Sequence, residues 1–533
     1  MSNHKRGPMR GMPAMRGGEK ARDFKGTMKK LLHYLGTKKI QIFIVFIFAV
    51  ISTVFNIVGP KILGKATTKV FEGVMGKIAG TTAGIDFVYV GKILIILVCL
   101  YVVSAIFSYL QSHIMTGVTT ELTYNLRKDI SHKINTLPLK YYDKQQTGEV
   151  LSRITNDVDT INQNLNQGLT QIITSITTVI GVLIMMASID ITMTIIALLI
   201  IPISSIFIMT VIHFSQKYFR SQQEYLGHVN GHIEEMYSGH SIVKAFNREK
   251  QSINDFNEYN DTLYHSAWKS QFLSGMMQPI MSFISNLGYV AICILGGYRA
   301  TKGFITVGDI QAFIQYVRNF TQPITQLANV SNILQQTAAA AERVFEFLDE
   351  EDEKETTTAP KEVNLNNVKG SVEFEHVYFG YDENKPIIKD FSSKVKPGQK
   401  IAIVGPTGAG KTTIVKLLMR FYDINSGSIK VDGVNINDYK RRDLRKMFGM
   451  VLQDTWLYND TVMNNIRYGN LNATDEDVEQ AAIATNVDHF IKTNVDGYQM
   501  ILNEEASNIS SGQKQLLTIA RALLADPKIL ILD

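Results

Sequence analysis

A glycine-rich run around residue 405 is the strongest chemical signal in the sequence. Its spacing, G-x-x-x-x-G-K-T, is typical of loops that bind the phosphates of a nucleotide. An apolar run at residues 401–404 predicts a buried strand before the loop, and residues 413–418 predict a helix after it. Backbone N–H groups in such a loop point at phosphate oxygens, and the start of the helix adds a partial positive charge. The residues expected to contact the nucleotide here are Gly405, Pro406, Thr407, Gly408, Ala409, Gly410, Lys411, Thr412 and Thr413.

Three polar side chains indicate how the phosphates and a metal ion would be held. The Lys411 ammonium is expected to reach the β- and γ-phosphates, and the Thr412 hydroxyl to ligate Mg²⁺. Asp533 follows the segment 528–532, whose residues 529–532 are apolar and predict a buried parallel strand beside the one before the loop, so its carboxylate would reach Mg²⁺ through water. A chance glycine-rich turn would explain neither the flanking pattern nor the second motif. The sequence therefore predicts a site for ATP and Mg²⁺.

Length and composition indicate more than one domain. The chain has 533 residues, of which 45% are hydrophobic, and a formal net charge of +5. Residues 1–335 contain apolar runs long enough to cross a bilayer, whereas the remainder has the pattern of a soluble α/β domain. Cys99 and Cys293 both lie in apolar runs, so we expect small core residues and neither a disulfide framework nor metal ligation.

The basic N-terminal segment, residues 1–38, is expected to stay in the cytoplasm as a tail. Its Lys and Arg cluster ends directly before the first apolar run, which places this end inside by the positive-inside rule. It has no apolar stretch followed by a small-residue cleavage site, so it does not resemble a cleaved signal peptide. It also lacks the interleaved aromatic residues typical of nucleic-acid binding, so no nucleic-acid partner is expected.

Six apolar segments are expected to span the membrane: residues 40–58, 93–110, 169–188, 191–212, 276–298 and 307–330. The first two would be joined by an external loop at 59–90, and the third and fourth by a tight external hairpin at Ile189 and Asp190. The sixth is the least apolar, and its polar residues predict a face turned toward a packed bundle or a water-lined pathway. The polar residues considered as possible substrate contacts are Gln278, Asn286, Gln311 and Gln315.

Two long polar segments, residues 111–168 and 213–275, connect spans two to three and four to five. Both have helical periodicity and one turn signal each, at Pro138 and at Ser238-Gly239. Each is expected to run down as a helix, turn, and return, projecting into the cytoplasm. Such arms suit contact with a cytoplasmic domain.

The remaining chain predicts a linker and a nucleotide-binding domain. The expected domains are an N-terminal tail at 1–38, a transmembrane domain at 39–335, a linker at 336–370 and a nucleotide-binding domain at 371–533. The predicted fold class is a membrane α-helical bundle of six transmembrane helices with long cytoplasmic extensions, followed by an α/β P-loop ATPase domain.

A second motif carries a resemblance to a known family. Residues 508–513 read Asn-Ile-Ser-Ser-Gly-Gln, which resembles the L-S-G-G-Q signature of ATP-binding cassette (ABC) proteins, with Ile509 and Ser511 as departures. Ser510, Ser511, Gly512 and Gln513 open a predicted helix and can form a second anion site. The resemblance implies that this site closes on the γ-phosphate held by another subunit, so that two chains enclose two ATP molecules.

Other motifs extend the resemblance over residues 25–533, to the bacterial half-transporters of the multidrug and lipid exporter type. Tyr381 is similar to the family's adenine-stacking aromatic residue. Gln453 resembles the Q-loop glutamine that meets Mg²⁺, and residues 503–505 resemble the X-loop. Residues 137–157 and 239–249 look like the intracellular loops whose short turns couple the two domains.

The resemblance also implies groups that would follow Asp533, namely the catalytic Glu, the D-loop and the switch His. We therefore expect the chain to be C-terminally incomplete, and its 533-residue product not to hydrolyse ATP appreciably. A strand ending at Asp533 would also leave its sheet unfinished.

The function implied is ATP-driven efflux of an amphiphilic drug, lipid or peptide across the cytoplasmic membrane by a dimer of half-transporters. Two alternatives stay open: a non-transporting ATP-gated channel or regulator, and an importer with the exporter fold. A protease-coupled peptide exporter is disfavoured, because residues 1–38 leave no room for a protease domain. The segment 503–510 lacks the glycine-rich approach common in homodimers, which favours a heterodimer.

Overall fold

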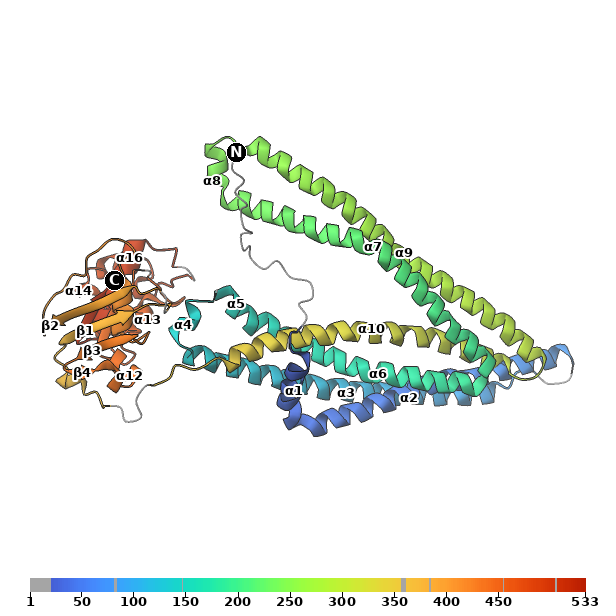
Figure 1. Cartoon of the computed structure of the whole chain (residues 1–533). Coiled ribbons are helices and arrows are strands. Elements are labelled where there is room, and N and C mark those ends of the chain that lie inside the picture. Colours follow the sequence, from blue (N-terminus) through green and yellow to red (C-terminus); the bar gives the residue numbers. More distant parts are fainter. Residues whose placement is uncertain are drawn as a thin grey trace. The chain divides into compact units, whose positions relative to one another are not determined.

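The computed structural model describes residues 21–80, 84–145, 147–355, 361–382, 385–453, 455–503 and 506–533. These form two compact units (Figure 1). The helical unit consists of the chain up to Ser131 and residues 151–349, and the nucleotide-binding unit consists of residues 132–150 and 350–533. Residues 1–20 of the predicted tail lie outside the described residues.

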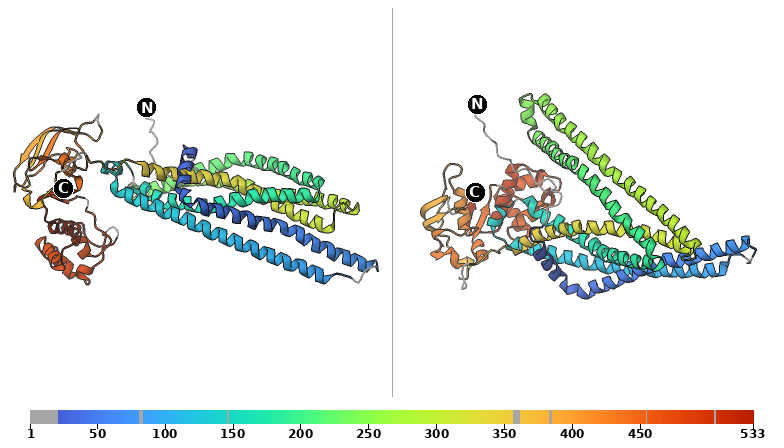
Figure 2. Two further views of the ribbon diagram at one scale, coloured as in Figure 1. Left: turned by 90° about the horizontal axis from the view of Figure 1, so that it is seen from below. Right: turned by 45° about the vertical axis from the view of Figure 1, so that its right-hand side comes forward.

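Long helices dominate the helical unit. In chain order they are α1 (Phe24–Tyr34), α2 (Lys39–Ile78), α3 (Phe87–Thr136), the π-helical turn Arg153–Asp157, α6 (Val158–Ile189), α7 (Ile191–Ser238), α8 (His240–Ala245), α9 (Glu249–Thr301) and α10 (Val307–Asp349). The last turn of α3 and most of α5 (Thr147–Ser152) belong to residues 132–150 of the nucleotide-binding unit. Each predicted span lies inside one of these helices, and the polar segments continue the same helices, as the periodicity predicted. Helix α7 runs beside α9 along its length in Figures 1 and 2.

Five described helical stretches are long and apolar enough to cross a membrane: α2, α3, residues 150–189, α7 and α9. Helix α10, which holds the predicted sixth span, is long enough but more polar. The count of six spans therefore stays a prediction. Helix α10 also continues without a break to Asp349, so residues 336–349 of the predicted linker are helical.

The predicted loop at 59–90 is wrong, because α2 continues through Pro60 to Ile78 and α3 begins at Phe87. A proline inside a helix removes one N–H donor and leaves carbonyls of the preceding turn without partners. Here the Tyr316 hydroxyl donates to the Ile57 carbonyl at 2.8 Å, which satisfies one of the groups near the interruption. A packed neighbouring helix therefore lets α2 pass the proline.

The core of the helical unit joins α2, α6, α7, α9 and α10. Its most deeply buried large side chains are Met186, Met193, Ile292, Phe313 and Tyr316. The predicted tight turn between α6 and α7 is confirmed, and Asp190 forms it. The Asp190 carboxylate caps α7 by accepting from the Met193 N–H at 3.0 Å and pairs with the Arg299 guanidinium at 2.7 Å.

The described residues of the nucleotide-binding unit form two small sheets. Strands β1 (Val372–Phe379), β2 (Ile388–Val395), β3 (Ser426–Val431) and β4 (Val434–Asn435) form an antiparallel sheet in the order β2-β1-β3-β4, and β5 (Phe448–Val451) pairs in parallel with β6 (Ile529–Leu532). The helices are α4 (Leu139–Tyr142), α11 (Lys411–Leu418), α12 (Arg441–Arg445), α13 (Val462–Arg467), α14 (Asp475–Ala484), α15 (Asp488–Thr493) and α16 (Ser511–Leu524).

Two hydrophobic clusters support this unit. One joins β1, β3, β5 and β6 to the apolar face of α11, and the other joins α13 to α16. The predicted helix at 413–418 and the strand at 528–532 are present, but the strand is only partly buried, since the Leu530 and Leu532 side chains are exposed.

The predicted buried strand at 401–404 is wrong. These residues form no described strand, and the Val404 side chain is 87% exposed. An apolar run becomes a strand only where a neighbour accepts its hydrogen bonds. Among the described residues β6 pairs with β5 and not with this segment, so the expected parallel partner is not beside it.

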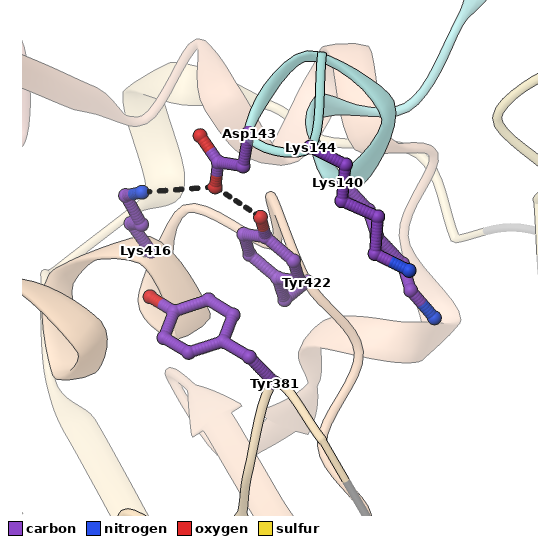
Figure 3. A pocket seen from close by; sticks show the side chains of 6 residues that line it. All are labelled: Lys140, Asp143, Lys144, Tyr381, Lys416 and Tyr422. Carbon is purple, nitrogen blue, oxygen red and sulfur yellow. Dashed lines mark hydrogen bonds and ion pairs between the residues drawn. The ribbon is translucent and has the colours of Figure 1, made fainter. Parts of the chain in front are cut away.

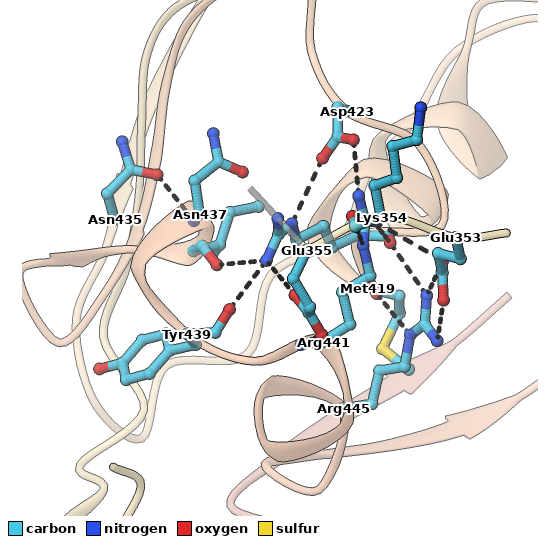
Figure 4. Close-up of polar contacts among 12 residues, drawn as sticks. Glu353, Lys354, Glu355, Met419, Asp423, Asn435, Asn437, Tyr439, Arg441 and Arg445 are labelled. Carbon is cyan, nitrogen blue, oxygen red and sulfur yellow. Dashed lines mark hydrogen bonds and ion pairs between the residues drawn. The ribbon is translucent and has the colours of Figure 1, made fainter. Parts of the chain in front are cut away.

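Residues 353–355 of the predicted linker form hydrogen bonds with Arg441 and Arg445 (Figure 4). The Arg445 guanidinium donates to the Glu353 carboxylate at 2.8 Å, and the Arg441 N–H donates to the Glu355 carboxylate at 3.0 Å. The Glu353 N–H donates to the Thr136 carbonyl at 2.8 Å. Residues 353–355 thus connect the end of α3 to Arg441 and Arg445 within the nucleotide-binding unit.

A single carboxylate closes the turn that leads into β1, and it supports a stability prediction. Asp432 accepts from the N–H groups of Lys369 and Ser371, both at 2.8 Å, and of Gly370 at 3.2 Å. Burial by itself raises the pKa of Asp432, but these backbone donors outweigh it and hold that pKa below its ordinary value. The carboxylate therefore stabilises the fold above its unfolded pKa of about 3.9, and this contribution is lost as the pH falls through the lower folded value.

We expect Asp432→Asn to destabilise the nucleotide-binding unit by about 1–2 kcal/mol at pH 7, because the hydrogen bonds lose their charge at a partly exposed site. Thermal unfolding of the purified protein at pH 7 measures this, and the difference should shrink below about pH 4. Asp526→Asn is the matched control, because Asp526 has a similar positive φ of 43° against 51° for Asp432. Equal effects of the two variants would contradict the prediction.

Candidate functional site

The phosphate loop wraps the start of α11. Gly410 caps the helix with a φ of +90°, and a Cβ there would lie 2.9 Å from the Ile388 side chain, so only glycine fits. The Lys411 ammonium donates to the carbonyls of Gly405 and Pro406 at 2.9 and 3.0 Å. The lysine is therefore held over its own loop, at the N-terminus of α11. There the N–H groups of the helix and its partial positive charge favour a phosphate.

Two of the three predicted metal ligands lie together. The Thr412 hydroxyl donates to the Asp533 carboxylate at 3.2 Å, although the two residues are 121 positions apart. Hydroxyl and carboxylate oxygens suit Mg²⁺, which usually adds phosphate oxygens and water to one or two protein carboxylates. The described residues contain no cluster of three His, Cys, Asp or Glu side chains that could hold a metal by themselves. The donor set therefore fits a metal that arrives with a nucleotide.

Gln453, the third predicted ligand, has an exposed side chain in the segment after β5. No hydrogen bond among the described residues joins it to Thr412 or Asp533, so its place at the metal remains a prediction. Its neighbour Asp454, and Glu504 and Glu505 of the predicted X-loop, lie outside the described residues.

The signature residues open helix α16. The Ser510 hydroxyl accepts from the Gln513 N–H at 3.3 Å, and the Gln513 side chain accepts from the Ser510 N–H at 2.8 Å. This reciprocal capping box fixes the first turn. Ser510, Ser511 and Gly512 are exposed, and a Cβ added at Gly512 would meet no atom within 4 Å. The turn thus presents an open surface that could receive an anion.

Tyr381 stands close to the start of α11. Its hydroxyl lies 3.4 Å from the Thr413 hydroxyl, and its ring is 39% exposed. The ring packs edge-on against Phe379 and Tyr422, with centroid distances of 5.1 and 4.9 Å. This position suits a stacking surface for a base whose phosphates lie on the loop.

The sequence did not single out Lys416 and Tyr422, which surround Tyr381. Lys416 lies five positions after Lys411 on the same helix, and Tyr422 follows that helix. Helical spacing places Lys416 beyond the phosphate loop, but only the fold brings it to Tyr381. No local pattern could have identified this contact.

The site and the long apolar helices together define a class: membrane proteins that carry a phosphate-loop nucleotide-binding domain. Comparison with known proteins agrees. Residues 42–324 match the family "ABC transporter transmembrane region", and residues 388–533 match the family "ABC transporter". The chain therefore belongs to the ABC transporter family. One transmembrane region followed by one nucleotide-binding domain makes it a half-transporter of the exporter type.

Curated relatives have the same architecture. The chain is 41% identical to the "Fatty acid ABC transporter ATP-binding/permease protein" of Mycobacterium bovis, over 96% of this chain and 86% of that protein. It is 32% identical to the "Putative multidrug export ATP-binding/permease protein YgaD" of Bacillus subtilis, over 95% and 87%. It is 33% identical to the "ATP-dependent lipid A-core flippase" of Syntrophus aciditrophicus, over 82% and 72%.

Proposed function

We propose that this chain is one half of a dimer that uses ATP to move an amphiphilic substrate out across the cytoplasmic membrane. The observation that carries the proposal is the open signature turn at Gly512, together with the phosphate loop on the same chain. Each motif offers backbone N–H groups at a helix start, which is half of an anion site. A second chain placed head to tail would complete both halves.

In this proposal each group has one task. Lys411 turns from the carbonyls of its loop to the β- and γ-phosphates. Thr412, Asp533 and Gln453 would hold Mg²⁺, which when bound would supply positive charge to the phosphate oxygens. Ser510 and the turn of Ser511, Gly512 and Gln513 contact the γ-phosphate from the other chain. ATP then favours the closed pair because it binds that state more tightly.

The substrate class rests on what the relatives' names say of them, which is fatty acids, lipids and drugs. Apolar helices like those of this chain could line a cavity for such molecules. We propose that the substrate is a lipid, a drug or a peptide. Among the polar candidates of span six, Gln311 accepts a hydrogen bond from Thr67 of α2, so it serves helix packing. Gln278 and Asn286 are exposed in the described chain and remain candidates.

The expected partner is a second, different half-transporter, because the segment before Ser510 lacks a glycine-rich approach. An ATPase assay on the full-length chain, purified without any other half-transporter, distinguishes a homodimer from a heterodimer. Vanadate-sensitive ATPase activity from this protein alone would mean a homodimer. Activity that appears only on co-expression with another half-transporter would support the heterodimer.

Transport itself is tested in proteoliposomes that contain the complete transporter and a fluorescent lipid or dye. We expect vectorial movement that requires ATP and is lost in Lys411→Ala. ATP-dependent conductance without substrate movement would instead support an ATP-gated channel. Movement in the opposite direction would support an importer.

A further inference from the structure

A cavity of about 360 Å³ lies beside Tyr381 in the nucleotide-binding unit (Figure 3). Half of its lining comes from Tyr381, Lys416 and Tyr422. The other half comes from Lys140, Asp143 and Lys144, on and directly after α4. Both halves belong to the same compact unit, although more than 200 residues separate them in the sequence.

Asp143 is the point at which the two halves meet. Its carboxylate accepts from the Lys416 ammonium at 3.2 Å and from the Tyr422 hydroxyl, as the dashed lines in Figure 3 mark. Burial raises the pKa of Tyr422, and the hydrogen bond to Asp143 raises it further, so the hydroxyl stays protonated and keeps donating. Leu139, at the start of α4, packs against the hydrophobic cluster around α11.

The same side chains form the aromatic corner of the cavity. The Tyr422 ring meets the Tyr381 ring at 84°, and the Lys416 ammonium lies 5.8 Å from the centroid of each ring. A planar base that stacks on Tyr381 would therefore lie beside Lys416 and Tyr422, the two side chains that Asp143 holds. Stacking of this kind is worth about 1–3 kcal/mol per base.

We propose that Asp143 is a positioning residue that couples the base of ATP to the segment of residues 139–144. Asp143 holds Lys416 and Tyr422 as one wall of the base site, and a seated base in turn stabilises the docked segment. The coupling must be reciprocal, since each event makes the other more favourable. The inference rests on the proposed function, because it takes ATP as the nucleotide on the phosphate loop.

Hydrogen exchange of the backbone of residues 139–144 tests the coupling in the complete transporter. We expect Mg²⁺-ATP to slow exchange in this segment and inorganic triphosphate, which has no base, to leave it unchanged. The slowing should disappear in Asp143→Asn. Equal protection by triphosphate, or protection by ATP that persists in Asp143→Asn, would overturn the inference.

Calorimetric titration measures the affinities of the wild type and the variants for ATP and for inorganic triphosphate. Asp143→Asn should weaken ATP binding by about fivefold or more, with triphosphate binding within about twofold of wild type, because the phosphate loop is untouched. Tyr422→Phe should weaken ATP binding by a similar factor. The double variant with both changes should bind ATP only slightly more weakly than either single variant. Asp159→Asn is the control, because Asp159 pairs with Arg127 and does not line the cavity. Equal losses for ATP and triphosphate would refute the coupling, whereas a wild-type protein that binds neither would refute the proposed function instead.

Discussion

Replacing Lys411 with alanine should remove most of the affinity for ATP. The ammonium already lies over the phosphate loop, 2.9 Å from the Gly405 carbonyl, so it needs only a short movement to reach phosphate oxygens. Charge-assisted contacts of this kind are worth about 2–3 kcal/mol in total, which corresponds to about 30- to 150-fold in the dissociation constant. Calorimetric titration with Mg²⁺-ATP measures the loss.

The control for this change is Lys446→Ala. Lys446 is also a lysine of the nucleotide-binding unit, but it pairs with Asp443 on the surface of α12. The Lys446→Ala variant should bind ATP with an affinity within about twofold of wild type, because surface ion pairs contribute little to stability. An affinity of Lys411→Ala within about threefold of wild type would contradict the assignment of the loop.

Replacing Gly512 with aspartate should separate nucleotide binding from pairing of the chains. Within its own chain a Cβ at this position meets no atom within 4 Å, so the fold should tolerate the change. Across a dimer the new carboxylate would face the γ-phosphate, and like charges placed together cost several kcal/mol. We expect ATP affinity within about threefold of wild type, and hydrolysis by the complete transporter lowered by about 100-fold or more.

Gln480→Asp provides the matched control for the added charge. Gln480 is exposed on α14, and no role is proposed for it. Its hydrolysis rate should stay close to that of wild type. If Gly512→Asp hydrolyses ATP as fast as Gln480→Asp, the signature turn does not meet a nucleotide, and the proposed pairing fails.

Periodicity and turn chemistry predicted the helical unit well, because those signals are local. Asp190 and Gly239 end helices where the sequence placed turns. The continuation of α2 past Pro60 was missed, since it depends on packing against Tyr316 of another helix. The strand expected at 401–404 was missed for a related reason: apolar residues favour a strand, but the neighbouring strand decides whether one forms.

The candidate site could be predicted where a motif is contiguous, as at Lys411 and Ser510. The approach of Thr412 to Asp533 was also predictable, because the phosphate loop and a carboxylate at a strand end together hold Mg²⁺ in phosphate-loop proteins. The contacts of Asp143 with Lys416 and Tyr422 were not, since they join segments more than 200 positions apart that only tertiary structure brings together. Resemblance marked residues 137–157 as a coupling loop but assigned no partner to this carboxylate.

Photo-crosslinking tests the central claim, which is that ATP lies between the phosphate loop of one chain and the signature turn of another. A benzophenone amino acid would replace Gln515, an exposed residue of α16 close to Gly512. With Mg²⁺-ATP, illumination should yield a two-chain adduct, and mass spectrometry should find the captured peptide in a glycine-rich phosphate loop of the second chain. Lys411→Ala should abolish the adduct. Capture that is independent of ATP, or capture confined to a single chain, would contradict the account.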